Sequence, residues 1–438
     1  VCMIQHSIAF ITAWEIMSLS SLFLVLFDYK NPKVIKAGVN YLVQMHLSVV
    51  LLTVGFIWAW FKTGTFDFRG LNDYFGQEVN IWLFLVFFAG FGFKSGFLGL
   101  HTWLPEAHPA APSHVSGVMS GVIVKLGIYG ILRIITFLKA EFLLIGVLIL
   151  CLSLLTGLFG ILNASLHRDF KRMLAYCTIE NIGIIGIGTG LGLIGIGTSQ
   201  PILTLLGFGG ALLHVLNHSL FKSLLFYSAG SVYRQTHTRD MDKLGGLIRH
   251  MPKTALLFLA ASVAIGGIPP FNGFVSEFLI YSGLLAGIKT SGISQMILLI
   301  ITFAGLAVIG GISVITFTKT FGTVFLGNQR QQTEHQATEV PSVMLVPQYL
   351  IVCLMLLIAF FPGFFIKTLF GIIDGMGLIQ NGYDSSYLVH TTGIMKGVSL
   401  SSVIFILISA AVFLLRKTLV KGSENLQSQT WGCGYVNP

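Results

Sequence analysis

Three side chains that can bind and release protons share one helical spacing inside an apolar stretch. His214, His218 and Lys222 occupy positions i, i+4 and i+8 of LLHVLNHSLFKSLLF. At 3.6 residues per turn they form one stripe, with neighbours about 5–6 Å apart. We call these residues the His–Lys stripe, and such a stripe can pass protons through intervening water. A zinc site is the alternative, but no carboxylate ligand accompanies the histidines on this segment, so proton transfer is favoured.

Charged side chains also interrupt other apolar stretches. These are Glu15 in AWEIMSLSSLFLV, Lys94 in FGFKSGFLGL, Lys125 in GVIVKLGIYG, Glu277 in FVSEFLIY and Lys319 in ITFTKTFG. Together with Lys222 they would cost roughly 15–20 kcal/mol if they faced lipid. That exceeds the net stability of about 5–15 kcal/mol that is typical of folded proteins. We therefore expect these groups to face one another or a hydrated interior, as on an ion or proton path.

Some of these residues also have simpler interpretations. Lys319, near one end of its segment, can extend its ammonium group to the membrane surface, and so can Lys94 near a helix break. For Lys125, in the middle of a segment, the alternative is a structural ion pair. His46, in YLVQMHLSVVLL, is expected to form a hydrogen bond between packed helices.

The composition predicts an all-α, polytopic membrane protein. Of the 438 residues, 54% are hydrophobic and only 10% are charged, whereas a soluble domain has about 25% charged residues. Runs of roughly 20 apolar residues, long enough to cross a bilayer, occur repeatedly. We predict eleven membrane segments, near 3–27, 37–61, 79–100, 113–138, 142–166, 173–198, 202–232, 252–286, 294–326, 343–371 and 397–415.

Two of these segments are expected to be broken helices, near 79–112 and 252–286. The first runs into HTWLPEAHPAAPSH and the second contains GGIPPFNGF. In lipid such breaks are tolerated only where protein or a watery cavity satisfies the freed backbone groups; the simpler alternative is a loop that happens to contain prolines. Paired breaks indicate a transport site between inverted repeats. We expect a first repeat at 1–166, a second at 167–326, and C-terminal helices with a tail at 327–438.

The basic residues of the loops predict the orientation in the membrane. Fifteen fall on the face where the first segment ends, and seven on the other. The fifteen are Lys30, Lys33, Lys36, Arg168, Lys171, Arg172, Arg234, Arg239, Lys243, Arg249, Lys253, Arg330, Arg416, Lys417 and Lys421. Because positive residues accumulate in cytoplasmic loops, the first face is predicted to be cytoplasmic, together with the C-terminus. The net charge of +9 is thus explained by topology, without nucleic-acid binding.

Other motifs exclude further chemistry. The five cysteines include no CxxC pair, so no metal or iron–sulfur centre and no cofactor are expected in this chain. GLGLIG, residues 190–195, lies inside an apolar segment and indicates close helix packing instead of dinucleotide binding. The chain begins with Val, and we expect its natural start to lie upstream.

Five stretches resemble the antiporter-like proton-channel subunits of respiratory complex I and of Mrp antiporters. They are AWEIMSLSSLFLV, the long stretch from FGFKSGFLGL to KLGIYGILR, DFKRMLAYCTIENIG, HVLNHSLFKSLLFYSAGSV and IPPFNGFVSEFLIYSGLL. The closing TWGCGY is more similar to the branch of hydrogenase-4 and formate hydrogenlyase, the group 4 membrane-bound hydrogenases.

The resemblance implies two inverted five-helix repeats and a role for each charged residue. Glu15 would pair with Lys94, Lys125 would link the two half-channels, and the His–Lys stripe would form the central axis. Glu277 would be the ionisable group of the second broken helix, and Lys319 would match a basic residue of the hydrogenase-type branch.

The implied function is proton translocation in a redox-driven complex of a bacterial or archaeal cell membrane. Other membrane-arm subunits and a peripheral redox arm, a hydrogenase or a dehydrogenase, would be the partners, and electron transfer would take place there. The alternatives are a subunit of NADH–quinone oxidoreductase, an Mrp-type Na⁺/H⁺ antiporter subunit, and a scaffold that anchors a hydrogenase without conducting protons.

Overall fold

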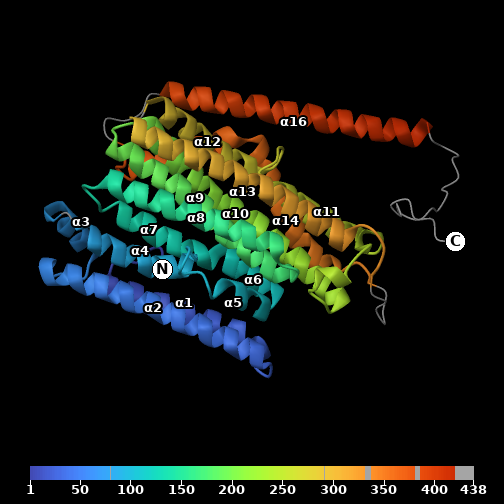
Figure 1. Ribbon diagram of the computed structural model, residues 1–438, viewed down its shortest axis with the longest axis horizontal. Helices are drawn as coiled ribbons and strands as arrows, with labels where there is room; N and C mark the ends of the chain where they lie inside the picture. The colour runs from blue at the N-terminus through green and yellow to red at the C-terminus, as the bar shows by residue number, and fades with distance from the viewer. Residues whose placement is uncertain (79, 291, 331–336, 380–384, 420–438) are drawn as a thin grey trace.

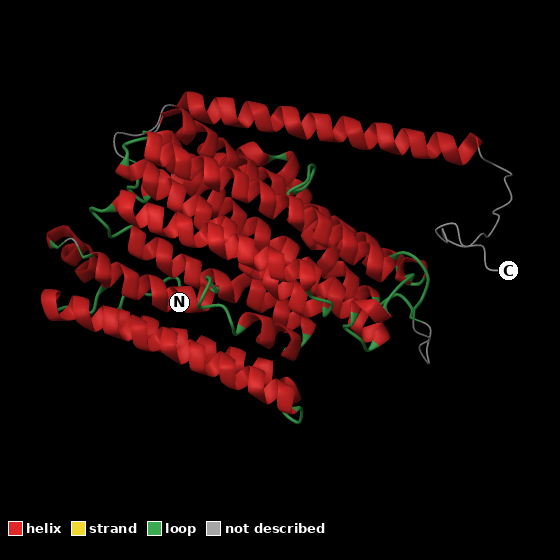
Figure 2. Ribbon diagram, viewed as in Figure 1, coloured by secondary structure: helices red, strands yellow, loops and turns green. Residues whose placement is uncertain are grey.

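The structure is a computed structural model that describes residues 1–78, 80–290, 292–330, 337–379 and 385–419. The described residues form helices joined by short connections, and no strand is assigned among them (Figure 2). The first eight α-helices are α1 (Ser7–Val25), α2 (Pro32–Thr63), α3 (Phe68–Gln77), α4 (Ile81–Ser95), α5 (Leu104–Ala110), α6 (Ser113–Val118), α7 (Val124–Ile135) and α8 (Phe142–Leu166). The others are α9 (Phe170–Gly197), α10 (Pro201–Thr236), α11 (Pro252–Ile265), α12 (Asn272–Thr290), α13 (Ile293–Phe325), α14 (Ser342–Phe360), α15 (Pro362–Gly375) and α16 (Ser385–Leu419).

The helices confirm the prediction of a polytopic membrane protein. Within the described ranges, nine helical stretches are long and apolar enough to cross a membrane, and α4 and α11 are shorter apolar helices. Figure 1 shows α1 and α2 at one edge of the bundle and α16 at the opposite edge. The segment predicted at 343–371 is two helices, because Pro362 starts α15 after the turn at Phe361. The closing TWGCGY lies outside the described residues.

The centre of the bundle is α9, which packs on both α8 and α10 and is almost wholly buried. Glycines allow this close approach. A Cβ atom on Gly160 of α8 would lie 2.4 Å from the backbone nitrogen of Glu180, and one on Gly190 would lie 2.8 Å from the carbonyl oxygen of Gly146. Contacts of this kind have no room for a side chain, so the interpretation of GLGLIG as a packing motif is confirmed.

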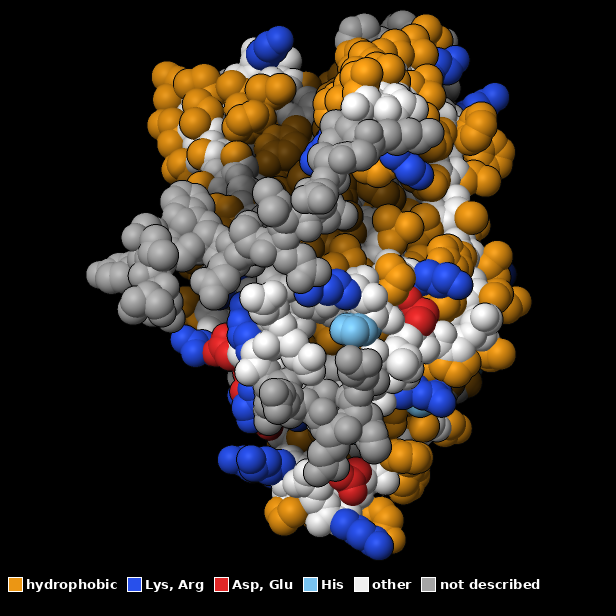
Figure 3. Space-filling view, turned by 90° about the vertical axis from the view of Figure 1, so that its right-hand side faces the viewer, with side chains coloured by type: hydrophobic (Ala, Val, Ile, Leu, Met, Phe, Trp, Pro, Cys, Tyr) orange, Lys and Arg blue, Asp and Glu red, His pale blue; other side chains and the backbone are white. Residues whose placement is uncertain are grey.

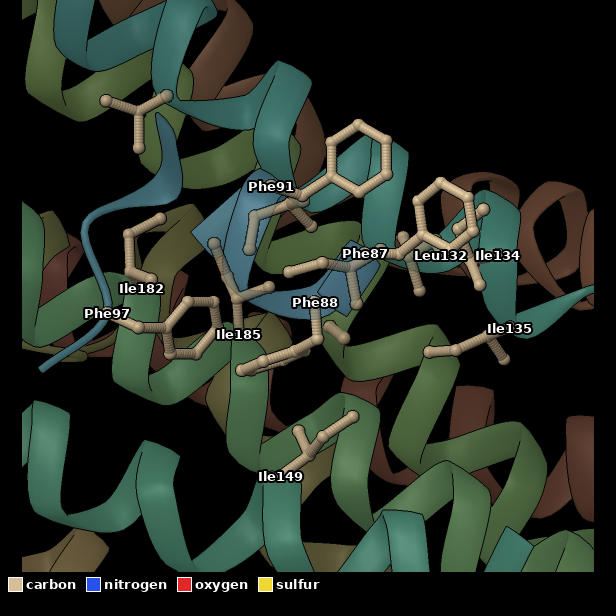
Figure 4. Close-up of a cluster of buried hydrophobic side chains, with 14 of the residues drawn as sticks. Phe87, Phe88, Phe91, Phe97, Leu132, Ile134, Ile135, Ile149, Ile182 and Ile185 are labelled. Atoms are coloured by element: carbon tan, nitrogen blue, oxygen red, sulfur yellow. The ribbon is translucent and has the colours of Figure 1, made fainter. Parts of the chain in front are cut away.

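Aromatic side chains fix the short helix α4 in place. Phe87, Phe88 and Phe91 project from α4 into a buried cluster with residues of α7, α8 and α9 (Figure 4). Trp14 of α1 packs against Phe91 with ring centroids 5.4 Å apart. Because Lys94 follows Phe91 by less than one turn, this cluster also fixes the position of its side chain.

Both predicted helix breaks are present. After α4, Gly96 adopts a left-handed conformation with φ of +83°. The amide of Leu98, freed from the helix, donates to Thr156 Oγ1 of α8 at 3.1 Å, and the Trp103 indole donates to the Phe93 carbonyl at 2.8 Å. Neighbouring helices thus satisfy the broken backbone, as a membrane interior requires.

The second break separates α11 from α12. Gly267 has φ of +64°, and the Ile268 amide donates to the Val263 carbonyl at 3.2 Å. Asn217 of α10 reaches across and donates to the Asn272 carbonyl at 2.6 Å. Asn217 thus connects the start of α12 to the adjacent long helix.

Basic side chains satisfy carbonyl groups around the short helix α5. The pairs are Arg172 Nε to the Pro105 oxygen at 3.3 Å, Arg239 to the Pro109 oxygen, and Lys171 Nζ to the Ala111 oxygen at 2.5 Å. We predicted that Lys171 lies in a loop, and this was wrong. Lys171 lies in the first turn of α9 and is buried, because α9 begins at Phe170 beneath the broken segment.

The loops predicted to share one face do lie together. The Phe170 amide donates to the Arg239 carbonyl, and the Met241 amide donates to the Arg168 carbonyl. The Gly246 amide donates to the Leu326 carbonyl. Figure 3 looks onto this end of the bundle, where Lys and Arg side chains gather. Which face is cytoplasmic, and the division into inverted repeats, stay predictions.

The glycine packing of α8 predicts the effect of a methyl group. Gly160→Ala should destabilise the protein by about 1–3 kcal/mol, since the added Cβ meets rigid backbone. Gly310→Ala, in α13, is the matched control, because a Cβ there has nothing within 4 Å and alanine favours helix by up to about 1 kcal/mol. Thermal unfolding in detergent measures both, and equal melting temperatures for the two variants would contradict the packing argument.

Candidate functional site

Lys94 is fully buried at the end of α4. Its ammonium group donates to Ser18 Oγ of α1 at 2.9 Å, to the Tyr41 hydroxyl of α2 at 3.3 Å and to Met45 Sδ at 3.2 Å. It also lies 5.8 Å from the Trp14 ring centroid and 5.5 Å from that of Tyr41, within the range of cation–π attraction. The group is thus held by neutral acceptors and by ring faces.

Glu15 does not form the expected ion pair with Lys94. Among the described residues its carboxylate pairs with His46, with 3.3 Å between Oε1 and Nε2. The reason is helical register, because Ser18, three residues after Glu15, supplies the hydroxyl that Lys94 binds. Glu15 stays within electrostatic reach of Lys94. For His46 we predicted a hydrogen bond between packed helices; its Nδ1 instead contacts the Leu42 carbonyl of its own helix at 3.1 Å, and its contact with α1 is the ion pair with Glu15.

Lys125 is buried next to an irregular turn. Residues Met119–Ile123 form a π-helix between α6 and α7, a feature that is frequent at functional sites. The Lys125 ammonium group donates to the Ser120 carbonyl, and Ser219 of α10 donates to the Gly121 carbonyl at 2.5 Å. Lys125 has no ion pair within the described part of the chain, which disfavours the structural ion pair as its role.

The His–Lys stripe lies on α10 and is completely buried. The His214 and His218 rings are stacked with centroids 6.4 Å apart, in keeping with the predicted spacing. The Lys222 ammonium group donates to the Leu174 carbonyl of α9 at 2.6 Å. Neither ring nitrogen of His218 has a hydrogen-bond partner among the described residues, so this ring can bind or release a proton without first breaking such a bond.

Polar side chains connect the stripe to the second broken helix. His214 contacts Asn181 Oδ1 of α9 at 3.0 Å and Ser276 Oγ of α12 at 2.9 Å. Asn217 donates to the same Ser276 hydroxyl at 2.9 Å. The residue after Ser276 is Glu277, so this network joins the stripe to the helix that carries this acidic group.

Glu277 is buried against the second break. A Cβ on Gly267 would lie 2.6 Å from Glu277 Oε2, so the carboxyl group fills the space that a side chain would occupy there. The left-handed turn at Gly267 and the position of this carboxyl group therefore depend on each other.

Lys319 lies apart from the other charged groups. Its side chain lies on the exposed side of α13 and donates to the Ser165 carbonyl at 3.1 Å, at the end of α8. This geometry fits the alternative in which Lys319 extends to the membrane surface.

Buried titratable residues that were not predicted include His108 and Glu180. His108 of α5 is fully buried, stacks on Phe226 with centroids 4.8 Å apart, and has no hydrogen-bond partner for either ring nitrogen among the described residues. Glu180 of α9 is 1% exposed. The rule that selected Glu15 would have found Glu180, since it also interrupts an apolar segment. His108 lies in the proline-rich break, where burial could not be predicted.

A cavity of about 1120 Å³ opens at the face with the basic loops. Pro109, Ala110 and Ala111 line it, so His108 directly precedes the lining in sequence. His108 also lies within electrostatic reach of Lys125, Lys171 and Lys222. The charged lining residues are Asp28, Lys33, Lys36, Glu106, Asp169, Lys171, Arg172, Arg234 and Arg239.

Together these groups form a series of buried titratable side chains on helices that pack on one another. α4 packs on α7, and α10 packs on α9 and α12. In this series His108, Lys125 and Lys222 lie within electrostatic reach of one another, whereas Lys94 and Glu277 are placed by the packing of their helices, α4 on α7 and α12 on α10. Such groups can hold protons in succession.

Curated proteins with similar sequences include a component of a hydrogenase and a subunit of a formate hydrogenlyase. The chain is 40% identical to hydrogenase-4 component B of Escherichia coli over 354 residues, which cover 80% of the chain and 52% of that protein. It is 36% identical to formate hydrogenlyase subunit 3 of the same organism over 341 residues, which cover 77% of the chain and 54% of that protein. The chain thus spans about half the length of these relatives.

Solved structures share the fold. An archaeal membrane-bound sulfane sulfur reductase matches with a TM-score of 0.80 and 23% identity, over 98% of this chain and 68% of that chain. Respiratory complex I from Thermus thermophilus matches with a TM-score of 0.71 and 24% identity, over 86% of this chain and 76% of that chain. Residues 5–310 match the family described as NADH:quinone oxidoreductase/Mrp antiporter, TM. The chain therefore belongs to the NADH:quinone oxidoreductase/Mrp antiporter transmembrane family.

Proposed function

We propose that this chain is a proton-translocating membrane subunit of a redox-driven complex of the group 4 hydrogenase type. The proposal rests on one observation above all: Lys94, Lys125, Glu277 and the His–Lys stripe are all buried. Charged groups at these depths are too costly to retain for packing alone and usually mark proton paths. The names of the curated relatives, hydrogenase-4 component B and formate hydrogenlyase subunit 3, favour the hydrogenase type.

Protons would enter through the basic cavity. From its lining, a proton would reach His108, whose ring nitrogens have no hydrogen-bond partner in the described part of the chain and which lies within reach of Lys125 and Lys222. Each lysine would then carry the proton on a flexible side chain. Because like charges repel, protonation of Lys125 disfavours protonation of Lys222, so that loading one site promotes release from the other.

Lys94 would couple this path to the edge of the bundle at α1 and α2. Its ammonium group would shift between Ser18 and the carboxylate of Glu15, which His46 holds in the present arrangement. In this scheme the pairing of Glu15 with Lys94 is a state that the subunit visits when Glu15 leaves His46. Such a shift changes the field at Lys125 and so drives the next proton transfer.

Electron transfer would take place in partner subunits, namely other membrane-arm subunits and a peripheral redox arm. This chain would hold no cofactor. The complex would lie in a bacterial or archaeal cell membrane, with the basic face and the C-terminus in the cytoplasm. Residues 420–438, the end of that tail, lie outside the described residues.

Replacement of Lys125 tests the proposal most directly. In vesicles that contain the assembled complex, Lys125→Met should reduce proton translocation per electron by about 100-fold, the usual contribution of a positioned proton carrier. Complex assembly and electron transfer should remain. A pH-sensitive dye reports translocation while formate, hydrogen or NADH is supplied in turn as donor, with and without Na⁺.

Lys319→Met is the control, because this exposed lysine lies apart from the series, and it should pump like the parent. Unchanged pumping in Lys125→Met would count against the proposal and favour a scaffold. Pumping that requires Na⁺ would favour an antiporter of the Mrp type, and NADH as the effective donor would favour complex I.

His108→Phe separates function from stability. Phenylalanine keeps the stacking on Phe226 and removes two buried nitrogens that lack partners among the residues that the structure describes, so stability should be unchanged or rise by about 1–3 kcal/mol. Proton translocation should fall by about 100-fold, as for loss of a proton carrier. The control is His167→Phe, whose ring packs on Tyr176 outside the series. A variant that pumps normally would show that protons enter by another route.

A further inference from the structure

Glu180 is a buried carboxyl group that the path above does not use. It lies in α9, the most deeply buried helix, and 1% of the residue is exposed. Its Oε2 atom has no hydrogen-bond partner among the described residues. A buried carboxyl group with an unsatisfied oxygen is costly, so its presence at the centre of the bundle calls for a function.

The surroundings of Glu180 place it between the basic and the acidic groups of the second half. Lys222 of α10 bonds to Leu174 before it on α9, and His214 bonds to Asn181 directly after it. The charged groups that act on the Glu180 carboxyl group are Lys222 and Glu277. One is a cation and the other an acid, and α9 lies against the helices that carry both.

Helix packing holds Glu180 in this position. The backbone of Glu180 is pressed against Gly160 of α8, where a Cβ would lie 2.4 Å from the Glu180 nitrogen. One turn later Gly183 meets Gly157 in the same way, with 2.4 Å between a Cβ on Gly183 and the Gly157 nitrogen. Because α9 cannot turn in this contact, the carboxyl group cannot leave for lipid and remains inside the bundle.

Glu180 does not form a closed ion pair with Lys222. No contact within 4.0 Å joins their charged atoms in the described structure, and the Lys222 ammonium group is hydrogen-bonded to the Leu174 carbonyl instead. A tight ion pair would hold the proton on the lysine. Because the Lys222 and Glu180 groups are not in contact, a proton can pass between them when the flexible lysine side chain moves.

We propose that Glu180 is a proton carrier between Lys222 and Glu277. This inference rests on the proposed function and adds a second acidic group to the path. In the first step the Lys222 ammonium group gives its proton to the Glu180 carboxylate, which leaves a neutral amine and a neutral carboxylic acid. In the second step Glu180 gives the same proton to the ionised Glu277 and becomes a carboxylate again.

The test uses the assembled complex in vesicles with the same donors and dye. Glu180→Gln keeps the shape and removes the acid, and it should lower proton translocation per electron by about 100-fold. Glu180→Asp restores the acid and should recover a large part of the rate, which a merely structural role would not predict. The control is Thr189→Val on the same helix, whose hydroxyl donates to the Ile185 carbonyl of that helix at 3.0 Å.

Infrared difference spectroscopy supplies a second readout. The parent complex and Glu180→Asp should show a protonated-carboxyl band on addition of the donor, with a frequency that differs between the two. If Glu180→Gln does not assemble, the infrared comparison of the parent complex with Glu180→Asp tests the inference instead. Identical bands in these two proteins would overturn it.

The two proposals fail in different ways. Normal pumping in Glu180→Gln, together with loss of pumping in Lys125→Met, would overturn the role of Glu180 and leave the proposed function intact. Normal pumping in both variants would overturn the proposed function and this inference with it.

Discussion

The need to keep ammonium groups away from hydrocarbon is the constraint on which the rest of this structure depends. Lys94, Lys125 and Lys222 are all buried, and each finds a neutral acceptor: a Ser18 hydroxyl, the Ser120 carbonyl and the Leu174 carbonyl. None of the three forms an ion pair in the described part of the chain. Neutral acceptors stabilise the cation less than a carboxylate does, so the lysines stay able to give up their protons.

Irregular helix geometry provides one of these acceptors, the Ser120 carbonyl, and it also frees backbone groups that need partners. The π-helix at Met119–Ile123 leaves carbonyl groups that Lys125 and Ser219 bind, and the breaks after α4 and α11 free further backbone groups. Each freed group needs a partner inside the bundle. Thr156 and the basic side chains around α5 are such partners, and Asn217 connects the start of α12 to α10.

The dense centre of the bundle gives these groups fixed positions. Glycines on α8 and α9 bring two backbones into direct contact at Glu180, and α10 carries the His–Lys stripe along the same helix pair. Only side chains can move in such a centre. Proton transfer here would therefore depend on lysine side chains and histidine rings, and the helices would act as a rigid frame.

The sequence by itself determined the fold class, both helix breaks and most of the buried charges, because apolar length, proline with glycine, and the cost of charge in lipid are local properties. Tertiary structure decided which groups pair, namely Glu15 with His46 and Lys94 with Ser18. It also decided that His108 and Lys171 are buried. Membrane helices are apolar all round, so hydropathy does not reveal which face meets protein and which meets lipid. Successive side chains of a helix point in directions about 100° apart, and packing alone fixes the rotation of the helix about its axis.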